Sequence, residues 1–171
     1  LSENCLDRNL KEKGNQIAII WEPNDPNEKF RTLTYNELHK EVCRFANALT
    51  GTGVKKGDRV CIYMPMIPEG ALAMLACARI GAIHSVVFAG FSAASLIDRI
   101  NDSKCSLVVT ADAVYRGEKK VELKKIVDEA LLHTPSIKNC IVFNHRNSNV
   151  EMKAGRDLWW HDVIKDASTE H

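Results

Sequence analysis

The clearest pattern of hydrophobic positions is a series of short apolar runs in the middle of the chain. The runs are Val60–Met64, Ile83–Phe88, Leu107–Thr110 and Cys140–Phe143. They are rich in β-branched residues and mostly continuous, whereas a strand with one solvated face alternates apolar and polar residues. This pattern predicts strands that are buried on both faces of a sheet.

The intervals between these runs carry the marks of helices. Pro68 at a first turn and Gly81 as a stop enclose the helix predicted for Glu69–Ile80. Ser92 is placed to cap a second helix, and the third has one apolar stripe at helical spacing: Leu123, Ile126, Val127, Ala130 and Leu131. Strands that alternate with helices favour right-handed crossovers. The predicted fold class is therefore α/β, with a mainly parallel sheet and helices on both faces.

Residues 1–34 form a lead-in that is rich in turns and short strands. Strands are predicted at Ile17–Trp21 and Phe30–Leu33, joined by the turn-rich stretch EPNDPNEK. Thr34 and Glu37 have the spacing of a capping box, which opens a helix that stops at Gly51. We expect a single partial domain over residues 1–171, with the lead-in at 1–34 and the α/β unit at 35–171.

Composition narrows the range of partners. The chain has 171 residues, of which 45% are hydrophobic, and this is enough for one domain with a core. The formal net charge is +1, from 23 basic and 22 acidic side chains. A balance this close provides no field that would hold a nucleic acid backbone or an anionic membrane. We therefore expect neither nucleic acid nor membrane partners, and the sequence predicts no oligomeric state.

The cysteines indicate a compartment rather than a site. The chain has six, with no CxxC pair and no histidine at metal-ligand spacing, so no metal site is predicted. Scattered thiols in a chain of this size are typical of a reducing compartment. The N-terminal stretch lacks the apolar core of a signal peptide, and no apolar run reaches membrane-spanning length. Together these features predict a cytoplasmic protein.

Several strings, taken in order, resemble a known family. They are LTYNEL at 33–38, KKGDRVCIYMPMIPE at 55–69, ACARIGAIHSVVFAGFS at 76–92 and YRGEKKVELKKIVDEAL at 115–131. The combination resembles the acetyl-CoA synthetases (acetate–CoA ligases), within the superfamily of adenylate-forming ligases. The similarity runs from about Asn4 to the WWHD segment at Trp159. The resemblance implies an N-terminal fragment, part of the large N-terminal domain of an adenylate-forming enzyme.

The resemblance also implies a two-step reaction. Acetate and ATP would give acetyl-adenylate, from which coenzyme A would displace AMP, with Mg²⁺ assisting in the parent enzyme. A triphosphate needs a loop rich in glycine and hydroxyl groups, usually with a lysine. None of the nine glycines lies in such a cluster. By resemblance, the phosphate loop, the adenine-binding residues and the catalytic lysine lie beyond His171, so we expect no catalytic residue and no activity from this chain alone.

Part of the coenzyme A site is implied in two stretches of this chain. The residues assigned by resemblance are Arg116, Gly117, Glu118, Lys119, Phe88, Ala89 and Gly90. On pattern alone, Arg116 and Lys119 equally fit the solvated rim of a helix, and Phe88 fits a tight turn with core aromatics. Two cations contribute on the order of 3–6 kcal/mol before ordering costs, so binding tighter than roughly 0.1 mM is not expected.

Other functions remain open at this point. One is a stand-alone α/β module that binds a nucleotide or coenzyme A without turnover, and another is a fragment of a propionyl-CoA synthetase. The acyl group is not fixed because the residues that select it would lie outside this chain. Half of a Rossmann dehydrogenase is disfavoured because no GxGxxG follows a predicted strand.

Overall fold

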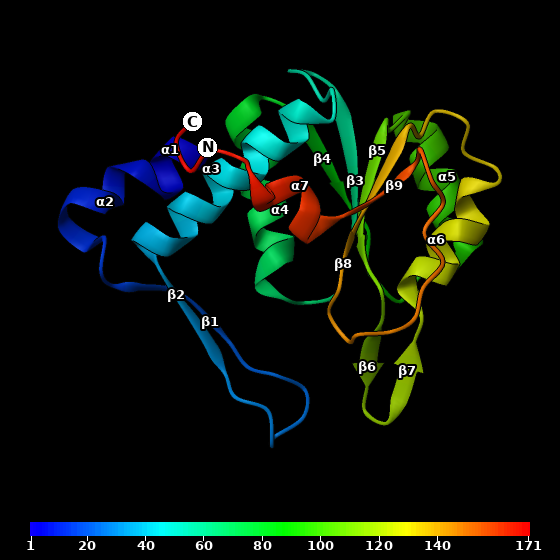
Figure 1. Ribbon diagram of the computed structural model, residues 1–171, viewed down its shortest axis with the longest axis horizontal. Helices are drawn as coiled ribbons and strands as arrows, with labels where there is room; N and C mark the ends of the chain where they lie inside the picture. Colours follow the sequence, from blue (N-terminus) through cyan, green and yellow to red (C-terminus); the bar gives the residue numbers. More distant parts are fainter.

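A five-stranded parallel sheet organises the chain, and the computed structural model describes it over residues 1–171. The strand order is β4-β3-β5-β8-β9 (Figure 1). The strands are β3 (Arg59–Tyr63), β4 (Ile83–Val86), β5 (Leu107–Ala111), β8 (Asn139–Phe143) and β9 (Asp157–Trp159). All their pairings are parallel, and β3 and β5 are buried along almost their whole length. The predicted fold class is confirmed.

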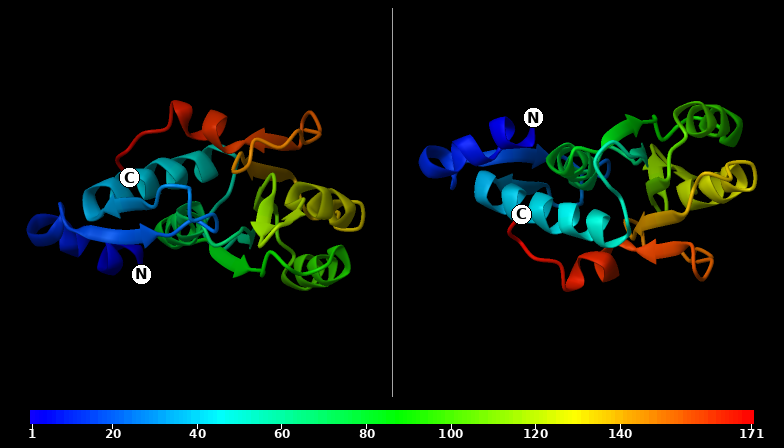
Figure 2. Two further views of the ribbon diagram at one scale, coloured as in Figure 1. Left: turned by 90° about the horizontal axis from the view of Figure 1, so that it is seen from below. Right: turned by 90° about the horizontal axis from the view of Figure 1, so that it is seen from above.

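The helices cover the sheet from both sides. On one side lie α3 (Tyr35–Gly51), α4 (Pro68–Ile80) and α7 (Trp160–Lys165), and on the other lie α5 (Ala93–Ser103) and α6 (Leu123–Leu131) (Figure 2). The chain moves outward from β3 to β4 and then reverses to reach β5. Because crossovers between parallel strands are as a rule right-handed, this reversal places α4 and α5 on opposite faces. The Trp160 ring stacks on Phe45 with centroids 3.7 Å apart, which fixes α7 against α3.

The N-terminal segment extends away from the sheet. Strands β1 (Ile17–Trp21) and β2 (Arg31–Thr34) pair antiparallel, and their connection projects from the body (Figure 1). The capping box is present: the Thr34 hydroxyl accepts from the Glu37 amide at 3.2 Å, and the Glu37 carboxylate accepts from the Thr34 amide at 2.8 Å. Helix α3 begins and ends where the sequence predicted. No helix in the fold is both long and apolar enough to cross a membrane.

Two short helices precede β1 and were not predicted. They are α1 (Ser2–Cys5) and α2 (Asp7–Lys13). Helix α2 buries no residue, so it has no apolar stripe that a sequence pattern could reveal. The segment is held instead by Leu6, which is buried between the two helices, and by an ion pair of 2.6 Å between Asp7 and Arg79 on α4.

Three other features differ from the sequence prediction. Strand β4 ends at Val86 instead of Phe88, and Phe88 is 55% exposed, so it is not a core aromatic. The YRGEK stretch forms an antiparallel hairpin of β6 (Val114–Arg116) and β7 (Lys119–Val121). The DLW segment, for which no strand was predicted, pairs with β8 as β9. Strands β6, β7 and β9 have three residues each, which is too short to show a hydrophobic period.

A buried cluster of charges ties β9 to α6. The Lys124 ammonium lies 2.9 Å from the Asp157 carboxylate and 2.6 Å from that of Asp128. Burial acts to raise the pKa of Asp157, but hydrogen bonds from Arg156 and Lys124 outweigh burial and hold the pKa below its usual value. The buried charges are therefore paired and hydrogen-bonded, which is the condition for tolerating them in a core.

Replacing Lys124 with methionine keeps the side-chain length but removes the buried cation from Asp157 and Asp128. We expect the free energy of unfolding to fall by about 1–3 kcal/mol, because Asp157 loses the buried ammonium but keeps its bond from Arg156, at 2.6 Å. Lys125→Met is the matched control, because Lys125 is exposed and its ion pair with Glu122, at 3.6 Å, lies on the surface. Urea unfolding measures both variants, and equal stability would contradict the role of the cluster in holding β9.

Candidate functional site

Two segments that are distant in sequence meet at the carboxyl edge of the sheet. Residues 88–90 follow β4, and the β6–β7 hairpin follows β5. Both strands pair in parallel with β3, so their carboxyl ends point the same way. This edge is where ligands bind in open α/β sheets.

The centre of the meeting point is a contact of Arg116 with Phe88 and Gly90. The Arg116 guanidinium carbon lies 4.5 Å from the centroid of the Phe88 ring, in cation–π geometry. A Cβ atom on Gly90 would overlap the guanidinium nitrogens of Arg116 and would stand 2.6 Å from the Phe88 ring. Only glycine therefore fits at this position while Arg116 keeps its place.

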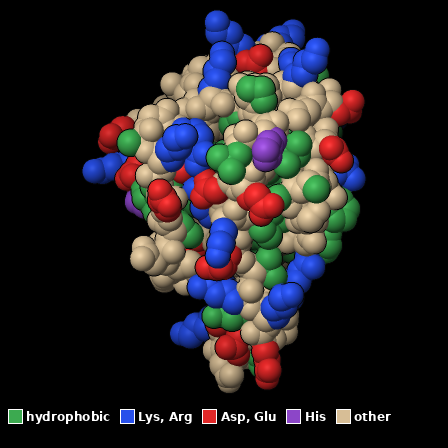
Figure 3. Space-filling view, turned by 90° about the vertical axis from the view of Figure 1, so that its right-hand side faces the viewer, with side chains coloured by type: hydrophobic (Ala, Val, Ile, Leu, Met, Phe, Trp, Pro, Cys, Tyr) green, Lys and Arg blue, Asp and Glu red, His purple; other side chains and the backbone are tan.

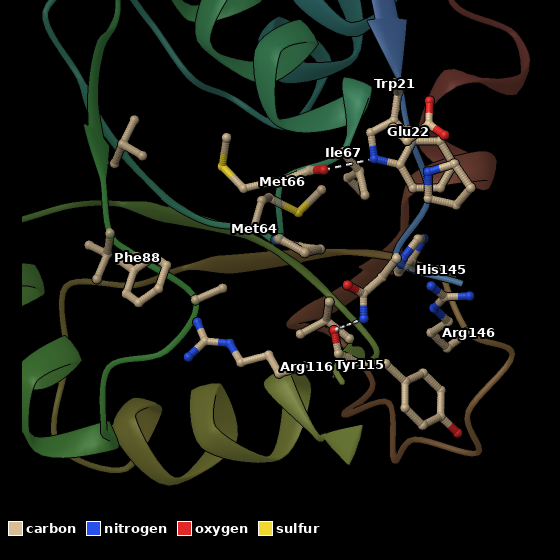
Figure 4. Close-up of a pocket in the computed structure, with 17 residues that line it drawn as sticks. Trp21, Glu22, Met64, Met66, Ile67, Phe88, Tyr115, Arg116, His145 and Arg146 are labelled. Carbon is tan, nitrogen blue, oxygen red and sulfur yellow. Dashed lines mark hydrogen bonds between the residues drawn. The ribbon is translucent and has the colours of Figure 1, made fainter. Parts of the chain in front are cut away.

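Arg116 separates two hollows. The first, here called the apolar hollow, has a volume of about 600 Å³, and Arg116 and Phe88 lie across it from Trp21, His145 and Arg146 (Figure 4). The second, here called the cationic hollow, has a volume of about 570 Å³ and contains Gly90 and four cations: Arg116, Lys119, Lys120 and Lys125. Five of the seven expected residues thus line these spaces: Phe88 and Ala89 line the apolar hollow, Gly90 and Lys119 line the cationic hollow, and Arg116 lines both.

The charge of the cationic hollow is positive but not uniform. Glu122 and Glu129 also line it, against the four cations. Viewed from the side of α5 and α6, the surface shows basic and acidic side chains intermixed (Figure 3). An anion with more than one charge suits such a site, since it can contact several cations at once.

Gly117 and Glu118 line neither hollow. Gly117 has a φ of +56°, the left-handed conformation that the turn between β6 and β7 needs. Glu118 is exposed beside it. In the structure these two residues shape the hairpin that presents Arg116 and Lys119, and do not face the hollows themselves.

Sequence reasoning missed a buried carboxylate that supports the apolar hollow. Asp112 is fully buried just after β5, and it accepts backbone N–H bonds from His145 at 2.8 Å and from Ser148 at 2.8 Å. These bonds fix the loop that carries His145 and Arg146 into the wall of the hollow. The sequence did contain one signal for Asp112, because it is a polar residue that directly follows a buried strand.

The loop that Asp112 holds contacts other segments around the apolar hollow. The Arg146 guanidinium lies 5.5 Å from the Tyr115 ring of the hairpin and forms an ion pair with Glu28 in the β1–β2 connection. Burial lowers the pKa of the His145 imidazole, and the charge of Arg146 lowers it further. No group of three or more His, Cys, Asp or Glu side chains is placed to hold a metal ion.

Comparisons with known proteins show which family the chain resembles. The family model of the AMP-binding enzymes matches residues 6–167. Over 170 residues, 99% of this chain, it is 55% identical to an acetyl-coenzyme A synthetase of Bdellovibrio bacteriovorus, and it is 56% identical over 172 residues to one of Yersinia pestis. In both cases the match covers 26% of the relative's length.

A solved structure shows the same fold. The acetoacetyl-CoA synthetase from Streptomyces lividans superposes with a TM-score of 0.87 over 98% of this chain and 25% of its own, at 24% identity. The resemblance to acetyl-CoA synthetases is confirmed, over about a quarter of the relatives' length. By its family match, its identity to these relatives and its fold, the chain belongs to the family of AMP-binding enzymes.

Proposed function

We propose that this chain is the N-terminal part of a ligase that activates acetate with ATP and transfers the acetyl group to coenzyme A. The observation that supports the coenzyme A site most directly is the position of Arg116. Its guanidinium lies over the Phe88 ring and against Gly90, and Arg116 lines the cationic hollow together with Lys119. The high identity to acetyl-coenzyme A synthetases supports the reaction class. The free thiols, all buried except that of Cys5, support a cytoplasmic location for the ligase.

In this proposal, ATP, coenzyme A and Mg²⁺ serve the whole ligase, and the present chain supplies part of the coenzyme A site. Acetate and ATP give acetyl-adenylate and pyrophosphate, and the coenzyme A thiol then displaces AMP. Arg116 and Lys119 donate N–H bonds to the phosphates at the nucleotide end of coenzyme A. No catalytic residue is assigned within these residues.

The packing of Arg116 suits it to this task. A guanidinium presents a planar fork of donors that can bind a phosphate in bidentate fashion. Contact with the Phe88 ring, whose centroid lies 4.5 Å from the guanidinium carbon, restricts the guanidinium before a ligand binds, which lowers the entropy lost on binding. Ala89 is buried and anchors the segment after β4, and the lack of a side chain at Gly90 leaves the room that the Arg116 guanidinium occupies.

The first test is the affinity for adenosine 3′,5′-bisphosphate, which carries the phosphates of the nucleotide end. We expect Arg116→Ala to weaken binding about tenfold or more, since a charge-assisted bond contributes about 1.5–3 kcal/mol. Lys138→Ala is the matched control, because Lys138 is exposed just before β8, at the other end of the sheet. NMR titration of each protein measures the affinity.

The same titration includes AMP as a second ligand. Because AMP lacks the 3′-phosphate, it should bind more weakly than the bisphosphate to the unmodified protein. Equal affinity for the two nucleotides, or an unchanged affinity in Arg116→Ala, would contradict the proposed site.

The second test concerns Gly90. Gly90→Ala places a methyl group where Arg116 and Phe88 now lie, so we expect the guanidinium to leave the ring and the bisphosphate affinity to fall, but by less than in Arg116→Ala because the cation is retained. Gly51→Ala is the control, since a Cβ there meets nothing within 4 Å. The ring-current shift of the Arg116 side-chain protons reports the displacement. Retention of that shift in Gly90→Ala would show that the contact is not as described.

The third test concerns turnover. We expect the 171-residue chain to show no acetate-dependent exchange between ATP and pyrophosphate, because none of its nine glycines lies in a loop suited to a triphosphate. A full-length acetyl-coenzyme A synthetase serves as the positive control. Exchange by the purified chain would mean that the phosphate site lies within these residues after all.

A further inference from the structure

Tyr63, the last residue of β3, joins the sheet to the segment that follows β4. Its side chain is fully buried, and its hydroxyl donates to the carbonyl oxygen of Phe91 at 2.7 Å. The pairing of β3 with β4 ends at Val86, and the Val87 amide still donates to the Ile62 carbonyl at 2.9 Å. The Tyr63 bond lies further along the chain, so it holds the part of the segment that backbone pairing does not reach.

Residues 88–91 form a tight turn that supports the Arg116 guanidinium. The amides of Gly90 and Phe91 both donate to the Phe88 carbonyl, at 2.7 and 3.0 Å. The Phe91 ring meets the Phe88 ring edge-on, with centroids 5.8 Å apart. Because the guanidinium of Arg116 packs against Phe88 and Gly90, a shift of this turn moves its support. A bond to the Phe91 carbonyl therefore acts on the Arg116 contact through the turn.

The same tyrosine is bonded to the strand that leads to the β6–β7 hairpin. Thr110 lies opposite Tyr63 in the pairing of β3 with β5, and its hydroxyl donates to the Tyr63 carbonyl at 2.9 Å. Thr110 is fully buried, and the chain continues from β5 into the hairpin that carries Arg116. Burial raises the pKa of the Tyr63 hydroxyl, against the charge of Arg116, so the hydroxyl is a donor at neutral pH. Tyr63 is thus bonded to both halves of the Arg116 contact.

We propose that Tyr63 is a positioning residue of the phosphate site, because its hydroxyl holds the turn at 88–91 where Phe88 and Gly90 receive the Arg116 guanidinium. Tyr63 itself meets no ligand, since it is fully buried and lines neither hollow. Its effect on affinity rests on the proposed coenzyme A site, whereas its effect on the contact between Arg116 and Phe88 needs no ligand. Phenylalanine at position 63 keeps the ring but leaves the Phe91 carbonyl without this donor.

The test is Tyr63→Phe in the 171-residue chain, followed by NMR. We expect the affinity for adenosine 3′,5′-bisphosphate to fall about three- to tenfold, the range that one hydrogen bond contributes. The ring-current shift of the Arg116 side-chain protons should decrease as well. Thr134→Val is the matched control, because it also removes a buried hydroxyl that donates to a backbone carbonyl, that of Ala130 at 3.3 Å. Thr134 lies between α6 and the start of β8, away from the hollows, so this control should change neither readout.

A double substitution shows whether Tyr63 acts through Arg116. If it does, Tyr63→Phe should add less than about twofold to the loss of affinity that Arg116→Ala already causes. Losses that multiply in the double variant would overturn the inference, and so would an unchanged affinity and ring-current shift in Tyr63→Phe, or an equal loss in Thr134→Val. Failure of the coenzyme A site is distinguishable, because Arg116→Ala would then leave the affinity unchanged, while the ring-current shift of the ligand-free chain still reports on Tyr63.

Discussion

Parallel pairing of β4, β3 and β5 is the constraint on which the rest of the structure depends. It brings the carboxyl ends of β4 and β5 to one edge of the sheet, so that Phe88 and Arg116 meet although α5 and β5 lie between them in the sequence. The contact is completed by Gly90, whose lack of a side chain leaves room for the guanidinium. The cationic hollow, its support and its separation from the apolar hollow all follow from this arrangement.

The sequence predicted the parts of the fold that repeat a pattern. Continuous β-branched runs marked β3, β5 and β8 because these strands are buried on both faces. The capping box at Thr34 marked the start of α3 because two side chains and two amides satisfy one another locally. The hairpin at Arg116 and strand β9 carry no such pattern, since each of their strands has three residues and depends on tertiary contacts.

The candidate site was predictable only in part, for the same reason. Resemblance selected Arg116, Lys119 and Gly90, and the structure places all three beside one hollow. That Arg116 would itself occupy the space over Gly90 depends on a contact between distant segments, which no local pattern encodes. Asp112 shows the same limit, because its partners are backbone amides of a loop that follows β8, far along the chain.

The cations at the β6–β7 hairpin and the glycine at position 90 suit a phosphate-bearing ligand at the carboxyl edge of the sheet. The most direct measurement for the central claim is a map of NMR shift changes in the chain on adding adenosine 3′,5′-bisphosphate. The account predicts the largest changes at Gly90, Arg116 and Lys119. Largest changes along β4 or at the amino ends of the strands, with these three unaffected, would contradict it.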